Sequence, residues 1–77
     1  MLSVTFKDRT NGRTTIEVMN DETISDAFTR ADRSFVPNTY SLNGTTISEA
    51  DLDQTFSDCG VTGDHAVISY VPKGNNA

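Results

Sequence analysis

The sequence predicts a single α+β domain, in which one helix packs across one face of a mixed sheet of four to five strands. Three observations lead to this fold class. Polar and apolar residues alternate over residues 2–7 and 14–19, which is the period of a half-buried strand. Apolar residues recur at helical spacing over residues 24–31. The most apolar, β-branched stretch, residues 66–71, suits a central strand that is covered on much of both faces.

The length and the charge of the chain limit its function. A domain of 77 residues has a small core, because it buries roughly 60% of the surface of its unfolded chain. Six Lys and Arg against eleven Asp and Glu give a net charge of −5, which argues against a nucleic-acid partner. Cys59 is the only cysteine, so no internal disulfide can form. Because His65 is the only histidine, a zinc site would need carboxylates or a second chain. We therefore expect no cofactor.

The first two strands are expected to form an antiparallel hairpin. Leu2, Val4 and Phe6 alternate with polar residues, and the same pattern returns over residues 14–18. The polar segment between them contains Asn11-Gly12, a pair that readily takes the positive φ angles of a tight turn. On this prediction, the outer face of the hairpin carries Thr5, Lys7, Thr15 and Glu17.

A helix is expected from about Ile24 to Arg33, with a length of about 10–12 residues. Thr23 is a natural N-cap, and Asp26 lies three residues later in a variant of the capping box. Pro37 stops the segment. The helix is expected to place Ile24, Phe28 and Ala31 against a sheet lined by Val4, Phe6, Ile16, Val18, Leu42 and Ile68.

The second half of the chain supplies the rest of the sheet. Residues 39–42 and 45–47 are expected to form two short strands, joined by a turn at Asn43-Gly44. Ser48 is expected to begin a helical turn, because acidic residues follow it at once. Residues 66–71 form the last strand, which is predicted to pair with the first strand in the middle of the sheet.

The domain is expected to span residues 1–72, followed by a disordered tail at residues 73–77. The tail has no apolar side chain larger than alanine, so we expect that folding does not require it. The alternating N-terminal residues lack the apolar block of a signal peptide. No stretch approaches the ~20 apolar residues of a transmembrane helix, so no membrane partner is expected. A free thiol without an export signal favours the cytoplasm.

Two segments, Tyr40 to Ile47 and Leu52 to Asp64, carry scaffold motifs. The first reads strand, Asn-Gly turn, strand, and the second reads Leu, turn, Gly-Val, turn, Gly-Asp. Together with the order of elements over residues 1–71, they resemble the β-grasp superfamily, which includes ubiquitin, the small sulfur carriers and short bacterial ubiquitin-like proteins. The resemblance implies a β-grasp fold. Sulfur carriers and conjugated members end in Gly-Gly, whereas this sequence ends Lys73-Gly74-Asn75-Asn76-Ala77, so the resemblance does not imply the carrier activity.

Few side chains are candidates for chemistry. Asp58 precedes Cys59, and an adjacent acid raises the pKa of a thiol, so Cys59 is interpreted as a packing residue rather than a nucleophile. His65 stands alone at the start of the last strand and is interpreted as a surface residue rather than a metal ligand. A calcium loop beginning at Asp51 would lack the required Gly at its sixth position and Glu at its twelfth.

These observations favour a non-enzymatic protein-interaction module. It would be a free-standing ubiquitin-like adaptor or a small subunit of a larger assembly, monomeric when isolated, with another protein as its partner. The alternative is a ubiquitin-like carrier that acts with an adenylating enzyme, and this function would require processing of the C-terminus.

Two surfaces are candidates for binding the partner. The outer face of the sheet ranks first, because sheet faces are the commoner contact in ubiquitin-like proteins. The acidic segment, defined as residues 49–64, ranks second, since its five acids without a base suit a basic partner. The residues singled out are Lys7, Thr15 and Glu17, with Tyr70 if it points outward, for the sheet face, and Asp51 and Asp53 for the acidic segment.

The last strand adds one open alternative. Val67 and Val71 lie on one of its sides, and Ala66, Ile68 and Tyr70 lie on the other. The side that does not meet the helix is either an exposed apolar contact patch or is shielded by side chains of the flanking strands. The pattern does not decide between these two interpretations.

Overall fold

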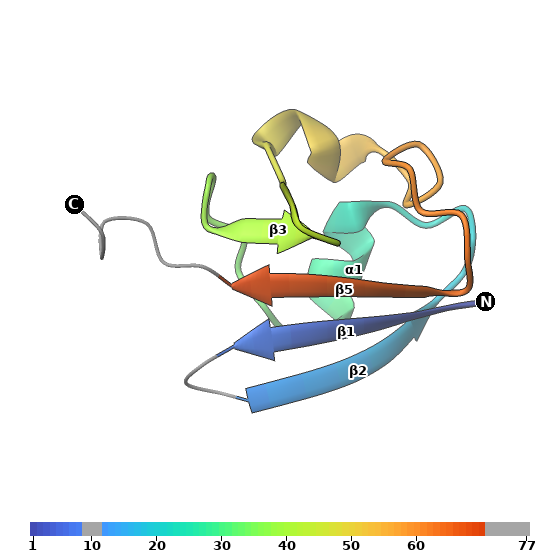
Figure 1. Ribbon diagram of the computed structural model, residues 1–77, viewed down its shortest axis with the longest axis horizontal. Coiled ribbons are helices and arrows are strands. Elements are labelled where there is room, and N and C mark those ends of the chain that lie inside the picture. The colour runs from blue at the N-terminus through green and yellow to red at the C-terminus, as the bar shows by residue number, and fades with distance from the viewer. Residues whose placement is uncertain (9–11, 71–77) are drawn as a thin grey trace.

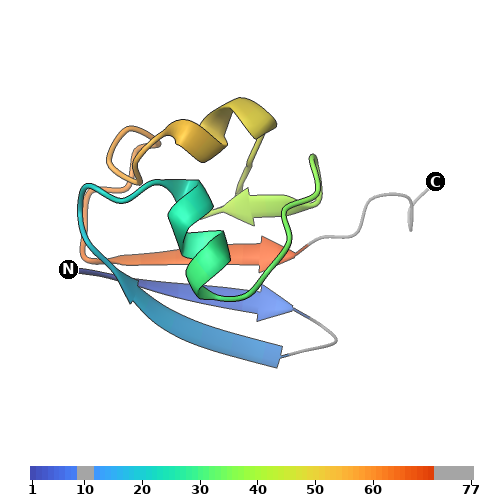
Figure 2. The same cartoon turned by 180° about the vertical axis from the view of Figure 1, so that it is seen from behind.

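The computed structural model describes residues 1–8 and 12–70. In order, the elements are β1 (Leu2–Asp8), β2 (Gly12–Val18), α1 (Ile24–Arg30), β3 (Tyr40–Leu42), β4 (Thr45–Thr46), the 3₁₀ helix η1 (Glu49–Asp53) and β5 (His65–Tyr70). Within the described residues, five strands form one mixed sheet in the order β2-β1-β5-β3-β4, and α1 lies across one face of it (Figures 1 and 2). The expected α+β class is therefore confirmed.

The centre of the sheet is the pair that the sequence predicted. β1 pairs in parallel with β5 on one side and antiparallel with β2 on the other. β3 joins the far side of β5 as an antiparallel neighbour, and β4 completes that edge. Of the predicted turn Asn11-Gly12, only Gly12 lies within the described residues, where its φ of 76° is a value that favours glycine. The expectations for Asn11, Val71, Pro72 and the tail at residues 73–77 lie outside the described part of the chain.

The start of α1 is fixed by the predicted capping box. The backbone N–H of Asp26 donates to Thr23 Oγ1 at 3.2 Å, and the backbone N–H of Thr23 donates to Asp26 Oδ2 at 3.0 Å. The first turn is also attached to the segment after η1, because the N–H of Ile24 donates to the carbonyl of Gln54 at 2.9 Å. Local capping and a long-range backbone bond therefore define the same helix start.

The end of α1 differs from the prediction, because the helix stops at Arg30 rather than Arg33. Asp32 takes a left-handed conformation with φ of 58°. The N–H of Arg33 then turns back to the carbonyl of Phe28 at 2.9 Å, and the N–H of Asp32 to that of Thr29 at 3.1 Å. This pair of bonds is a Schellman motif, which closes the helix after seven residues.

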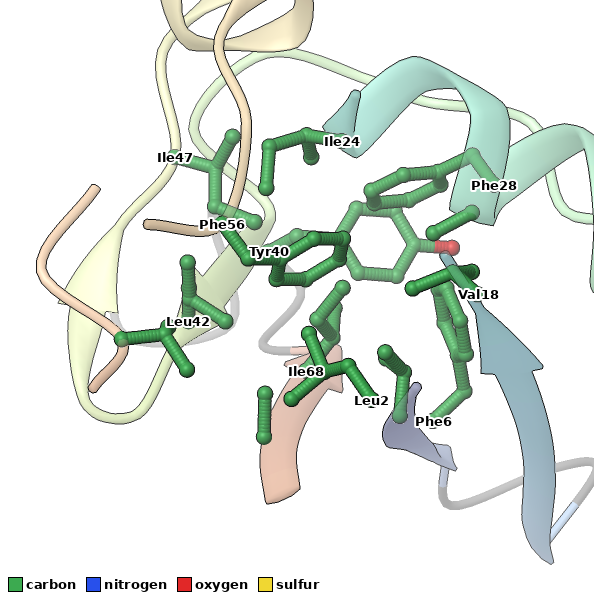
Figure 3. Close-up of a cluster of buried hydrophobic side chains, with 14 residues drawn as sticks. Leu2, Phe6, Val18, Ile24, Phe28, Tyr40, Leu42, Ile47, Phe56 and Ile68 are labelled. Atoms are coloured by element: carbon green, nitrogen blue, oxygen red, sulfur yellow. The ribbon is translucent and has the colours of Figure 1, made fainter. Parts of the chain in front are cut away.

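The hydrophobic core lies between α1 and the inner face of the sheet, which is the face that α1 covers (Figure 3). The ring of Phe28 is at its centre and makes edge-to-face contacts with three other rings. The centroid distances are 5.2 Å to Phe6, 5.4 Å to Phe35 and 4.8 Å to Tyr40. Such arrangements add to the stabilisation that comes from burial alone.

The predicted core is confirmed for most of its residues, with two corrections. Ile16 and Ala31 are only partly buried, although both pack against the core. Ile16 lies on the edge strand β2 and Ala31 is the C-cap of α1, so each is at the margin of the packed layer. The core also includes Leu2, Ala27, Tyr40, Ile47, Phe56, Val61 and Ala66.

The exposed edge of the sheet at β2 is partly covered by an arginine from α1. Arg30 Nη1 donates to the backbone carbonyl of Glu17 on β2 at 2.6 Å. The same guanidinium makes a bidentate ion pair with Glu22, with N–O distances of 3.0 and 2.7 Å. Glu22 thus holds the arginine against a backbone acceptor on the outer edge of β2, beside which the described residues place no further strand.

Candidate functional site

The outer face of the sheet, which is the side away from α1, has no helix or strand over it in the described part of the chain (Figure 1). The pairing register arranges its side chains in three rows that run across the strands. These rows are Arg13, Lys7, Ser69, Ser41 and Thr46; then Thr15, Thr5 and Val67; then Glu17, Ser3 and His65. Of these side chains only that of Val67 is apolar, so the face is polar. The first row is called the cation–hydroxyl row.

Three of the predicted site residues lie on this face, one in each row. Lys7, Thr15 and Glu17 are all exposed. Thr15 Oγ1 lies 3.1 Å from Thr5 Oγ1, and the neighbouring strands leave Thr5 only 7% exposed. The structure therefore brings these residues onto one surface, as expected from the alternation of strand side chains.

Tyr70 is a correction to the predicted set. Its position in the register puts it beside Tyr40, and the two ring centroids lie 5.1 Å apart. Tyr40 is a core residue, and Tyr70 is partly buried against the same core. The side chain thus lies with Ala66 and Ile68 on the inner face, not on the outer face with Lys7.

The open question about the last strand is settled for its described residues. The apolar side of β5 that carries Ala66 and Ile68 faces α1 and is fully buried. On the outer side, Val67 is half-buried between polar rows. Residues 1–8 and 12–70 therefore place no contiguous apolar patch on the outer face, and Val71 is outside these ranges.

The acidic segment is less free than its sequence suggests. Asp51 is half-buried, and its Oδ2 accepts hydrogen bonds from the backbone N–H and the hydroxyl of Ser48, at 2.9 and 3.1 Å. Asp58 and Thr55 form a similar local pair, in which the N–H of Asp58 donates to Thr55 Oγ1 at 3.1 Å. Asp53 is exposed. Asp51 therefore acts as a structural cap rather than as a freely solvated charge.

The cysteine lies in a setting that disfavours its reactive form. Cys59 is partly buried against the core, and burial raises the pKa of its thiol, with Asp51 and then Asp58 adding to the rise. A cleft of about 260 Å³ lies beside it, between α1, β4 and η1. His65 is exposed at the start of β5. The thiolate that a nucleophile requires is therefore less available here than in an exposed cysteine.

Arg33 is a residue whose role the sequence did not indicate. The loop after α1 carries its side chain back to the hairpin end of the sheet, where Nη2 donates to Thr14 Oγ1 at 2.9 Å. Nη1 lies 3.8 Å from Asp8 Oδ2, and both side chains are largely buried. Nε makes no hydrogen bond to the described residues. Near it, burial raises the pKa of Tyr40, a rise that the positive charge of Arg33 opposes.

Three further findings bear on what the chain does. In residues 1–8 and 12–70, no His, Cys, Asp and Glu side chains gather in a group of three or more that could hold a metal ion. Over the same residues, no helix has the length and apolar character needed to cross a bilayer. Comparison with protein-family models, curated proteins and solved structures finds no match. The fold thus defines a small α+β domain in which the described residues leave the polar outer face of the sheet uncovered.

Proposed function

We propose that the chain is a β-grasp, ubiquitin-like domain that acts as a non-enzymatic protein-interaction module and binds its partner through the outer face of its sheet. Three features support the β-grasp assignment. An N-terminal hairpin precedes the helix, the helix crosses one face, and β1 pairs in parallel with β5 at the centre. The resemblance of the sequence motifs points to the same superfamily.

The observation that carries the proposal is that no helix or strand among residues 1–8 and 12–70 covers the outer face. A sheet face that no helix covers offers a flat surface on rigid strands, and the side chains of Ser3, Lys7 and Glu17 project from it in a fixed register. Hydroxyl, ammonium and carboxylate groups supply both donors and acceptors. Polar groups at a protein contact provide specificity, and bridging waters fill the gaps between the two partners.

Other parts of the described chain support binding less well. The inner face is occupied by α1 and its core. In the acidic segment, the carboxylate of Asp51 accepts from the N–H of Ser48 at 2.9 Å, and that of Asp58 accepts from the N–H of Thr55 at 3.4 Å. A partner would therefore compete with the caps that hold η1 and the following turn. Cys59 has a raised thiol pKa, which favours packing over covalent chemistry.

Site-specific photocrosslinking in the native host tests this proposal. A photoreactive benzoylphenylalanine in place of the exposed Thr15 would report on the outer face. The same group in place of Thr29, exposed on α1, or Asp53, exposed on η1, would serve as matched controls. We expect one protein adduct of defined mass from position 15 and none from the controls. Adducts from position 53 alone would assign binding to the acidic segment, and the absence of any adduct would contradict the module.

A further inference from the structure

The cation–hydroxyl row contains a like-charge pair that the fold does not require. Lys7 and Arg13 lie directly opposite each other on β1 and β2, and both are exposed on the outer face. Like charges at directly opposed positions of an antiparallel pair destabilise it. In the described part of the chain, the ion pairs are Arg30 with Glu22 and Arg33 with Asp8, so neither Lys7 nor Arg13 is neutralised there.

The location of this pair matters because the protein as a whole is acidic, with a net charge of −5. Asp64 precedes the start of β5, whereas Lys7 pairs with Ser69 near its end. Asp64 and Ser69 are five residues apart, which corresponds to about 17 Å of strand and exceeds the Debye length of about 8 Å at physiological ionic strength. The nearer acid is Asp8, which follows Lys7, and its Oδ2 lies 3.8 Å from Nη1 of Arg33. Because Arg33 offsets that carboxylate, Lys7 and Arg13 form a local positive site on an acidic protein.

The rest of the row extends this positive site with neutral donors. Ser69 follows Lys7, Ser41 follows Ser69, and Thr46 ends the row on β4. A depression of about 410 Å³ lies at its basic end, where the hairpin end of the sheet brings together Lys7, Asp8, Gly12, Arg13, Ser69 and Tyr70. Five strands at about 4.8 Å spacing give the row a length of roughly 19 Å, which an extended peptide of about six residues would span.

We propose that the cation–hydroxyl row binds an extended acidic segment of a partner protein, which lies across the strands with its carboxylates at Arg13 and Lys7. Charge-assisted bonds from these two cations to carboxylates are the strongest contacts that the row can make. Two cations on an acidic domain are too few for a nucleic acid, whose affinity depends on many phosphate contacts. This inference rests on the proposed function and specifies the chemistry of the partner.

An NMR titration of the whole chain with a synthetic peptide tests the inference. The probe is a capped peptide of about six residues with alternating Glu and Ser, and its neutral counterpart has Gln in place of each Glu. At low ionic strength, we expect the acidic peptide to cause saturable shifts of the amide signals of Lys7, Arg13 and Ser69. The neutral peptide should cause none. Added salt should weaken the binding, because it screens exposed charges.

Matched variants identify the contribution of the cations. The double change Lys7→Gln and Arg13→Gln should weaken binding roughly tenfold, since it removes both charge-assisted contacts. The control Ser57→Asp and Thr62→Glu makes the same change in net charge at exposed positions beyond the other end of β5, and should leave the affinity within about twofold. Lys7→Arg keeps the charge and should retain binding. Each variant's own spectrum verifies that it is folded.

The other outcomes overturn the inference. Equal affinity for the neutral peptide would show that the row does not recognise carboxylates. Equal affinity of the double Gln variant for the acidic peptide would show that Lys7 and Arg13 do not contribute to binding. Shifts that appear on concentrating the protein without peptide, at both Lys7 and Asp53, would assign the row to a second copy of this chain. A failed titration alongside a specific crosslink from position 15 would reject an acidic peptide as the ligand of the row. The proposed interaction module would still be supported by the crosslink.

Discussion

The two faces of the sheet are built from alternate residues of the same strands, and they differ in almost every property. On the inner face, Val4 and Phe6 are at most 1% exposed and pack against α1. On the outer face, their sequence neighbours Thr5 and Lys7 are polar, and Lys7 is exposed. Consecutive side chains of a strand point to opposite faces. Residues that stabilise the fold and residues that the proposed partner would contact therefore alternate along the same strand. A substitution on one face can be chosen to leave the other face unchanged.

The largest expected effect is on the inner layer. Phe28→Ala should lower the free energy of unfolding by about 3–5 kcal/mol, because it leaves a cavity among three aromatic rings in a small core. Urea or thermal unfolding measures the loss, with the exposed Thr29→Ala as control. A Phe28→Ala protein that melts within a degree or two of the unmodified chain would show that this stripe is not the core.

Adjacent residues of β5 offer a direct comparison between the faces. Ile68→Ala should cost about 2–5 kcal/mol, because Ile68 is fully buried on the inner face. Val67→Ala, one position earlier on the outer face, should cost less than about 1 kcal/mol. Both values come from the same unfolding assay. Similar losses for the two variants would break the distinction between the faces.

A smaller effect is expected at alkaline pH. Burial raises the pKa of Tyr40, so folding favours its neutral phenol. The associated stability is present below the unfolded pKa of about 10 and is lost as pH rises through the folded value. Chemical denaturation between about pH 9 and 11 should show this decline, and Tyr40→Phe should reduce it. A decline that is unchanged in Tyr40→Phe would place its origin elsewhere.

The smallest expected effect has the opposite sign and belongs to the outer face. Lys7→Gln should raise the free energy of unfolding by about 0.2–1 kcal/mol at low salt, because it removes a repulsion with Arg13. The gain should disappear as salt screens the pair. Arg13→Gln provides the matched change on the other strand. A loss of stability in both variants would indicate that the two cations support the fold.

Much of the fold was predictable because its signals are local. Period-2 alternation identified β1 and β2, and the capping box at Thr23 and Asp26 identified the start of α1. The end of α1 was not predictable, because the left-handed turn falls on Asp32 rather than on a glycine. A cap that uses Asp in place of Gly or Asn carries a weak sequence signal.

The site was predictable only in part, because it depends on register and on which side the helix packs. Alternation put Tyr70 on the same side as Ala66 and Ile68, but only the position of α1 assigns that side to the core. The row that aligns Lys7 with Ser69 joins distant segments of the chain, and no local pattern fixes their register. The ion pair of Arg33 with Asp8 depends in the same way on the return of the chain after α1.

The contact between Arg30 and Glu17 affects how copies of this domain behave beside one another. β2 lies at the edge of the sheet, and an uncovered edge strand can recruit strands from other molecules into a growing fibre. A strand arriving at Glu17 would have to displace a guanidinium that also holds Glu22. Arg30 therefore disfavours the addition of a strand from another molecule at the β2 edge. This edge borders the polar outer face, so the same contact lowers the tendency of the domain to aggregate there.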